Sequence, residues 1–125
     1  FLKKAKESNV VNITSLNGKI AMSNNPAYNA SKGGLTALTF SLAMDFAKYK
    51  IRVNAVSPGY IKTNMTKKSY NNFSQYKKRI DRMMTSNYGT PEDVANTVLF
   101  LSSEEAKYIN STEVVVDGGL LKKGI

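Results

Sequence analysis

The 125-residue sequence contains no cysteine and no histidine. Without cysteine the chain has no disulfide, no thiolate nucleophile and no cysteine ligands for a metal ion. Without histidine it lacks the usual general base and the commonest metal ligand. We therefore expect no metal site, and we expect any acid–base chemistry to use tyrosine, lysine or a carboxylate.

Acidic residues are also scarce, because 9 aspartates and glutamates stand against 18 lysines and arginines, which gives a net charge of +9. Such an excess is compatible with nucleic-acid binding. The basic residues are scattered, however, apart from clusters in residues 3–6 and 67–82. We interpret them as a solvated surface and expect no nucleic-acid partner. The alternative is that some of these charges meet an anionic substrate or a cofactor phosphate.

The chain lacks apolar runs long enough to cross a bilayer, so we expect no membrane contact. Its first residues have neither the apolar core of a secretory signal nor an initiator methionine. We expect a cytoplasmic protein, and a chain that opens on Phe1 looks like the middle of a longer one.

Short β-branched segments alternate with helical patterns. The predicted strands are residues 10–13, 51–56 and 112–116, and the predicted helices are residues 28–48, residues 67–84 as one or two basic helices, and a helix that Thr90 caps. Residues 1–7 are interpreted as the tail of a helix. This alternation predicts an α/β fold with a parallel sheet. Three strands leave apolar edges and faces to cover, so we expect that part of the domain lies outside this chain.

The predicted helix over residues 28–48 is apolar on more than one side. A stripe at helical spacing is formed by Leu35, Leu38, Leu42 and Phe46, and further apolar residues fill much of the remaining circumference. Two interpretations follow. The helix is the central helix of one domain, or one face packs on the sheet while another packs on a partner subunit.

Tyr28 and Lys32 lie at the start of this helix, four residues apart, so both functional groups point to one side. A phenol with an ordinary pKa of about 10 is a poor proton donor at neutral pH, and an adjacent ammonium favours its ionised form. A tyrosine and a lysine at this spacing are common, and only the surrounding motifs make the pair a candidate for catalysis.

Five blocks in fixed order supply those motifs: residues 11–15, 28–32, 52–59, 91–95 and 116–119. Together they resemble the short-chain dehydrogenase/reductase family, in its common type that includes 3-oxoacyl-carrier-protein reductases and sugar dehydrogenases. The resemblance implies that residues 1–125 are the C-terminal half of one doubly wound, parallel-sheet (Rossmann-like) domain that binds NAD or NADP. It also implies an oxidoreductase that interconverts a secondary alcohol and a ketone by hydride transfer.

The same resemblance implies roles for individual residues. Ser15, thirteen residues before Tyr28, orients the substrate. Tyr28 is the general acid or base on the substrate oxygen, and Lys32 favours the ionised phenol and hydrogen-bonds the nicotinamide ribose. The nicotinamide and its carboxamide are held by Pro58, Gly59, Ile61 and Thr63. Residues 60–88 are the substrate lid.

Some family features are missing from this sequence. The Gly-rich turn that seats the pyrophosphate is not present, and Gly33-Gly34 lies inside a predicted helix where it cannot replace that turn. The catalytic asparagine and the residue that selects NAD or NADP are also not in the chain, and Ile109-Asn110-Ser111 stands where the family has Ile-Thr-Gly. The alternative hypothesis is therefore a non-catalytic fragment that keeps the fold and assembly helices but binds no cofactor. Family members pair the helix over residues 28–48 across a two-fold axis, which implies a homodimer or homotetramer.

Overall fold

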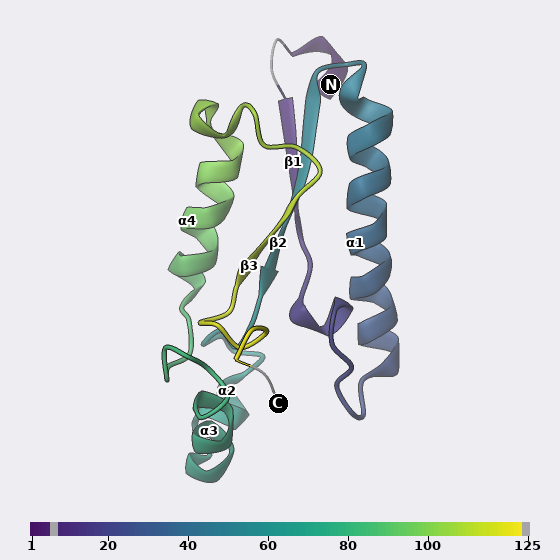
Figure 1. Ribbon diagram of the computed structural model, residues 1–125. Helices are drawn as coiled ribbons and strands as arrows, with labels where there is room; N and C mark the ends of the chain where they lie inside the picture. The colour runs from purple at the N-terminus through teal and green to yellow at the C-terminus, as the bar shows by residue number, and fades with distance from the viewer. Residues whose placement is uncertain (6–7, 124–125) are drawn as a thin grey trace.

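The computed structural model describes residues 1–5 and 8–123, which form an α/β structure (Figure 1). Its sheet contains β1 (Ser8–Ile13), β2 (Ile51–Pro58) and β3 (Glu113–Val116), all parallel, in the order β1-β2-β3. Helix α1 (Pro26–Ala47) lies on one side of the sheet and α4 (Pro91–Ser102) on the other. The α/β fold with a parallel sheet, predicted from the alternating pattern, is confirmed.

The central strand β2 is buried along most of its length, as expected for a parallel strand that helices cover on both faces. Val53 and Ala55 are fully buried, and Ile51 packs with Val53 against Ala43 of α1. The strand continues two residues beyond the predicted end. Pro58 is tolerated as the last residue of the strand. Its missing N–H would be needed only in the interior of the sheet.

The predicted apolar stripe of α1 is partly wrong. Leu35, Leu42 and Phe46 are half-buried, but Leu38 is 49% exposed. The inward face centres instead on the buried Thr39 and Ala43, whose small side chains let the helix approach the sheet closely. The Thr39 hydroxyl donates to the carbonyl of Leu35 (2.8 Å), which satisfies a polar group that hydrophobicity alone would place outside.

The N-terminal prediction also needs correction. Instead of the tail of an α-helix, residues Leu2–Lys4 form a single 3-10 turn, and Ala5 is extended. Lys6 and Glu7 lie outside the described residues. Ser8 already belongs to β1, and its hydroxyl donates to the Leu2 carbonyl (2.9 Å), so the strand begins two residues earlier than predicted.

The segment after β2 contains two short helices, α2 (Lys67–Tyr70) and α3 (Phe73–Ile80), which is the second of the two predicted alternatives. They lie beyond the lower end of the sheet in Figure 1. The chain then enters α4 through the predicted cap. The Thr90 hydroxyl accepts from the Asp93 N–H, while the Asp93 carboxylate accepts from the Thr90 N–H.

The outer edge of β1 is open in this structure. Strand β1 pairs with β2 on one side and has no partner among the described residues on the other. No helix within residues 1–5 and 8–123 combines the length and the apolar character needed to span a membrane.

Candidate functional site

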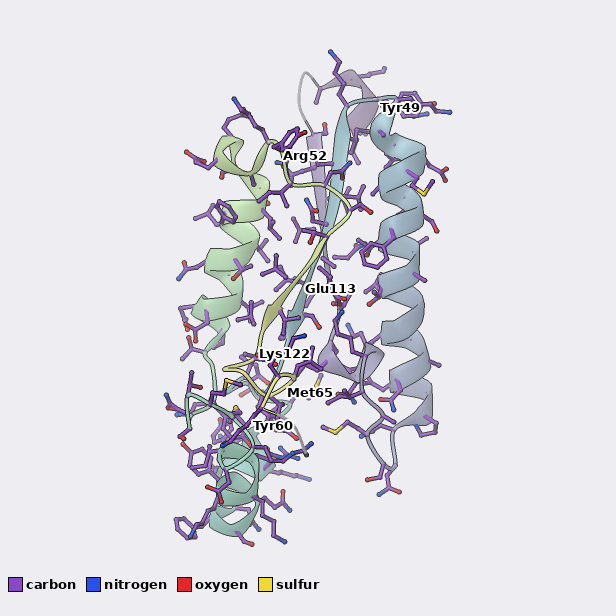
Figure 2. The ribbon with its side chains drawn as sticks, viewed as in Figure 1. Tyr49, Arg52, Tyr60, Met65, Glu113 and Lys122 are labelled. Atoms are coloured by element: carbon purple, nitrogen blue, oxygen red, sulfur yellow. The ribbon has the colours of Figure 1, made fainter. Side chains whose placement is uncertain are left out.

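The strands of the sheet end on the same side of the molecule, at its lower end in Figure 1. The last residues are Ile13 in β1, Pro58 in β2 and Val116 in β3. In open parallel sheets, ligands bind outside the carboxyl ends of the strands. Figure 2 shows Tyr60 and Met65 at this end of the sheet, near helices α2 and α3.

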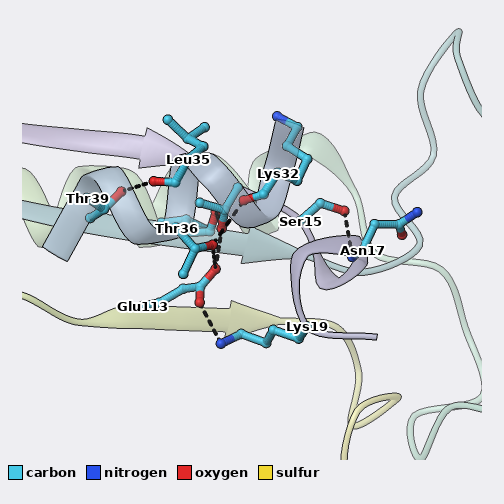
Figure 3. A network of polar contacts seen from close by, with 10 residues as sticks. Ser15, Asn17, Lys19, Lys32, Leu35, Thr36, Thr39 and Glu113 are labelled. Carbon is cyan, nitrogen blue, oxygen red and sulfur yellow. Dashed lines mark hydrogen bonds and ion pairs between the residues drawn. The ribbon is translucent and has the colours of Figure 1, made fainter. Parts of the chain in front are cut away.

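Ser15 follows β1 at this edge and is held firmly. The Thr14 N–H donates to the Val56 carbonyl (2.8 Å), which extends the β1–β2 ladder by one residue. Ser15 is then extended and buried, and it caps the 3-10 turn η2 (Leu16–Gly18). Its Oγ accepts from the Asn17 N–H (3.2 Å; Figure 3), so the hydroxyl hydrogen is left for another acceptor.

Turn η2 packs directly on the start of α1. A Cβ on Gly18 would lie 3.0 Å from both the carbonyl carbon and the carbonyl oxygen of Lys32. Close by, the Asn17 side chain donates to the Asn29 side chain (3.0 Å), and Asn29 donates in turn to the Met22 carbonyl (3.3 Å). These contacts fix the distance between Ser15 and the first turns of α1.

Tyr28 and Lys32 lie one turn apart on α1. The Tyr28 side chain is 40% exposed, and the Lys32 Nζ lies 5.7 Å from the centroid of its ring. Lys32 Nζ also donates to the carbonyl of Ile13 (2.9 Å), the last residue of β1. One of its three ammonium hydrogens is thereby used, and the lysine is tied to the strand that leads into Ser15.

A cavity of ≈ 780 Å³ opens between α1, the strand ends and helices α2 and α3. This volume is within the range of sites for small molecules and cofactors. Every residue that the sequence singled out lines it: Ser15, Tyr28, Lys32, Pro58, Gly59, Ile61 and Thr63. The structure therefore brings together all the predicted site residues, from three separate segments of the chain.

Gly59 also has a packing role in this cavity wall. A Cβ at this position would lie 2.7 Å from the Cβ of Asp117 in the turn after β3. The Gly59 N–H donates to the Val116 carbonyl (2.9 Å). The glycine is thus explained by the close approach of β2 and β3, whatever binds in the cavity.

Sequence reasoning missed Thr66, which shapes the loop that carries Ile61 and Thr63. Its Oγ1 donates to the Ile61 carbonyl (2.5 Å) and accepts from the Thr63 N–H (2.9 Å). A single hydroxyl therefore closes this loop on itself. The only signal in the sequence is a threonine three residues after another, which is too common to single out a site.

Sequence reasoning also missed a buried carboxylate beside the site, Glu113 of β3, whose side chain is only 2% exposed. Oε1 accepts from the hydroxyls of Thr14 (2.5 Å) and Thr36 (3.3 Å), and Oε2 forms an ion pair with Lys19 Nζ (2.5 Å; Figure 3). Burial raises the pKa of Glu113, but the hydrogen bonds and the charge of Lys19 outweigh burial, so the pKa lies below its ordinary value. The one hint in the sequence was an acid inside an otherwise apolar strand.

Within the described residues, no group of three or more acidic side chains is arranged to hold a metal ion. The functional groups that the cavity does bring together are the hydroxyl of Ser15, the phenol of Tyr28 and the ammonium of Lys32.

Comparison with known proteins yields close matches. The family described as enoyl-(acyl carrier protein) reductase matches residues 2–121. The 3-oxoacyl-acyl-carrier-protein reductase of Buchnera aphidicola is 43% identical over 117 residues, which cover 94% of this chain and 47% of that protein.

Solved structures also match the chain. A crystal structure from Agrobacterium tumefaciens, assigned as a 2-deoxy-D-gluconate 3-dehydrogenase and containing bound NADP, has a TM-score of 0.91 at 38% identity and covers 96% of this chain and 49% of that one. A 4-hydroxyisoleucine dehydrogenase complexed with NADH has a TM-score of 0.90 at 35% identity, covering 94% and 48%. The chain spans about half the length of the relatives it matches.

Proposed function

The chain belongs to the short-chain dehydrogenase/reductase family, and on this basis we propose that it is the C-terminal, catalytic half of an NAD- or NADP-dependent oxidoreductase. The enzyme interconverts a secondary alcohol and a ketone. The observation that carries the proposal is the convergence of Ser15, Tyr28 and Lys32 on one cavity. In this proposal residues 1–125 are the C-terminal part of one Rossmann-like domain, with residues 60–88 as its substrate lid.

The residues of the cavity fit a nicotinamide nucleotide. Lys32 Nζ keeps two of its three donors after its bond to Ile13, enough to reach ribose hydroxyls. Pro58 and Ile61 offer apolar surface to a nicotinamide ring, and Thr63 adds a polar group beside them. When bound, the cofactor supplies or accepts the hydride. Related structures contain NADP or NADH, which supports either form for this chain.

In the proposed reaction, Tyr28, Ser15 and Lys32 act from the positions that they occupy in the structure. During reduction, the carbonyl carbon gains a hydride while the Tyr28 hydroxyl gives its proton to the carbonyl oxygen. The free hydroxyl hydrogen of Ser15 stabilises the negative charge that develops on this oxygen. The ammonium of Lys32 stabilises the Tyr28 phenolate that is left, which then regains a proton from solvent. Oxidation of the alcohol follows the same path in reverse.

Removal of the phenolic hydroxyl tests this function. In the full-length protein, Tyr28→Phe should lose turnover by at least about 100-fold, the scale of general acid–base catalysis, yet still bind the cofactor. Tyr49→Phe is the matched control, because Tyr49 lies just beyond the other end of α1 (Figure 2) and should keep full activity. Full activity in Tyr28→Phe would refute the assignment.

A second candidate function applies to the 125-residue chain by itself: a non-catalytic fragment that keeps the fold and cannot bind cofactor. The unpartnered edge of β1 among the described residues favours it. Titration of the isolated chain with NADH and NADPH, followed by fluorescence, separates the two states. Binding of either nucleotide in the nanomolar to micromolar range would contradict the hypothesis of a fragment that cannot bind cofactor.

The partner proposal is a homodimer or homotetramer formed through the helix over residues 28–48. Its support is the set of apolar side chains of α1 that are exposed in the single chain, namely Leu38, Phe40 and Met44. The cytoplasmic location expected from the sequence stays a prediction.

A further inference from the structure

We propose that the substrate of this cavity carries an anionic group, a carboxylate or a phosphate ester, and that Arg79 of α3 binds it. The inference rests on the proposed function, because it treats the cavity beside Tyr28 as the place where the carbonyl or alcohol reacts. It adds the chemical class of the substrate and the residue that selects it.

The charge of the cavity wall is the first observation. Of the residues that the structure describes, three cationic side chains line the cavity, Lys32, Lys68 and Arg79, and no aspartate or glutamate does. A cleft with walls of one sign concentrates ligands of the opposite sign, because low-dielectric walls focus the field. The lining therefore favours an anion over a neutral or cationic ligand.

Arg79 is held in place before any ligand arrives. Its Nη1 donates to the Tyr88 hydroxyl (3.3 Å), and its guanidinium carbon lies 4.8 Å from the centroid of the Tyr60 ring. Tyr88 is itself buried, and its ring stacks on that of Tyr76 with centroids 5.3 Å apart and planes at 9°. Arg79 is thus set on a packed group of tyrosines, and a fixed guanidinium loses little entropy on binding an anion.

Among residues 1–5 and 8–123, no acidic side chain serves as a counter-ion for Arg79. No carboxylate of the described residues forms an ion pair with it, and its partners Tyr60 and Tyr88 are neutral. The guanidinium has five N–H donors, of which the bond to Tyr88 uses one. The remaining donors suit a two-point contact with a carboxylate or a phosphate group.

The other two cations are less suited to this task. Lys32 is already bound to the Ile13 carbonyl and lies beside the Tyr28 ring, where the proposed chemistry uses it. Lys68 is exposed, and a lysine is a flexible, strongly hydrated point charge. The anion is therefore bound from the lid by Arg79 while α1 presents Tyr28 to the reacting carbon, so substrate binding bridges the two walls.

The test compares matched substrates on the full-length enzyme. The pairs are an oxo acid with its methyl ester, and a phosphorylated ketone with its unphosphorylated parent. In at least one pair, the wild-type enzyme should have a higher kcat/KM for the anionic member than for the neutral one. Arg79→Gln should lower kcat/KM for that member by about 10- to 100-fold, the worth of charge-assisted hydrogen bonds, mainly through KM. The neutral member should change by less than about 3-fold, within the range of ordinary context effects, and Arg79→Lys should restore part of the loss.

Lys78→Gln is the control, because it removes the same charge from an exposed position of α3 that does not line the cavity. It should behave as wild type. An equal loss for both members of a pair, or a wild-type preference for the neutral member, overturns the inference. So does a rise in KM confined to NADH or NADPH, which would assign Arg79 to a cofactor phosphate.

Calorimetric titration with the same oxo acid and phosphorylated ketone provides a readout that needs no turnover. Wild type and Lys78→Gln should bind the preferred anion, and Arg79→Gln should bind it at least about 10-fold more weakly. If the anion binds in this Arg79-dependent way but nothing is reduced, the proposed function fails and the anion site stands. If Arg79→Gln binds the anion as tightly as wild type, or wild type binds neither anion, the anion site fails.

Discussion

Gly18 lies directly against the backbone of Lys32, with room for a hydrogen but not for a methyl group. A Cβ there would stand 3.0 Å from the Lys32 carbonyl carbon and oxygen, and both are backbone atoms that cannot turn aside. Gly18 ends the 3-10 turn that Ser15 caps. The contact therefore sets how far the Ser15 hydroxyl lies from the side chains that α1 presents.

Gly18→Ala should consequently impair catalysis more than stability. The turn must move outward by a few tenths of an ångström, which misplaces Ser15 relative to Tyr28, and we expect kcat to fall by about 10-fold. Gly34→Ala is the matched control, since a Cβ there meets nothing within 4 Å and alanine favours a helix by about 1 kcal/mol. It should raise the melting temperature and leave kcat unchanged. A Gly18→Ala enzyme with wild-type kcat would show that the contact does not position Ser15.

Ser111 stands where the family pattern has glycine, and the structure gives it a φ of 56°, in the left-handed region. A side chain in this region costs about 1 kcal/mol, which glycine avoids. We therefore expect Ser111→Gly to stabilise the protein by about 1 kcal/mol, measured as a higher midpoint of urea unfolding with an unchanged slope. Ser102→Gly, in the last turn of helix α4, should instead destabilise it. Equal or lower stability in Ser111→Gly would mean that the serine side chain contributes more than the strain costs.

The pKa of Glu113 makes stability depend on pH in a defined direction. Its folded-state pKa lies below the ordinary value, because Lys19, Thr14 and Thr36 together outweigh the effect of burial. The ionised carboxylate therefore stabilises the fold above the unfolded pKa of about 4.3, and this contribution is lost as the pH falls through the lower folded pKa.

Glu113→Gln should remove that contribution. At pH 7 we expect the variant to be less stable by about 1–3 kcal/mol, because hydrogen bonds to a charged acceptor become neutral ones. Below pH 4 the difference in free energy of unfolding between variant and wild type should become smaller. Urea unfolding at pH 7 and at pH 3.5 measures both effects, and Asp45→Asn, on the exposed side of α1, should follow wild type at both. A gap of the same size at both pH values would contradict the proposed charge effect.

The sequence predicts this fold well where the information is local. The strands around Val53 and Val115 and the helix that Thr90 caps follow from short apolar patterns and capping residues, and these depend only on near neighbours. The site prediction has a different basis, because Ser15 and Tyr28 are singled out by motifs in a fixed order; the structure places both at one cavity, and their roles stay a prediction.

What the sequence could not predict depends on contacts between distant segments. Glu113 gains its role only because β3 places it against Thr14, Lys19 and Thr36, up to 99 residues away. Similarly, Leu38 fits an apolar stripe, but α1 approaches the sheet through the smaller Thr39 and turns Leu38 outward. Periodicity locates an apolar face without stating which neighbour will cover it.

The outward turn of Leu38 leads to the last prediction, which concerns assembly. Leu38, Phe40 and Met44 place exposed apolar side chains on α1, and Met44 is 79% exposed. Phe40 and Met44 are four residues apart and so lie on one side of the helix, and exposed apolar side chains grouped in this way commonly mark an interface. If two copies of the full-length protein pair through α1, a charge placed there is buried without a partner, which costs several kcal/mol in each copy.

Met44→Glu in the full-length protein should therefore shift the oligomer by at least one step toward monomer, as measured by analytical ultracentrifugation at micromolar concentration. Phe73→Glu is the control: Phe73 is 80% exposed, but it lies in α3 at the far side of the cavity from α1. It should leave the sedimentation coefficient unchanged. Because α1 also carries Tyr28 and Lys32, dissociation should be accompanied by reduced turnover, as the helix loses the support of its outer face. An unchanged oligomer in Met44→Glu would place the subunit contact elsewhere.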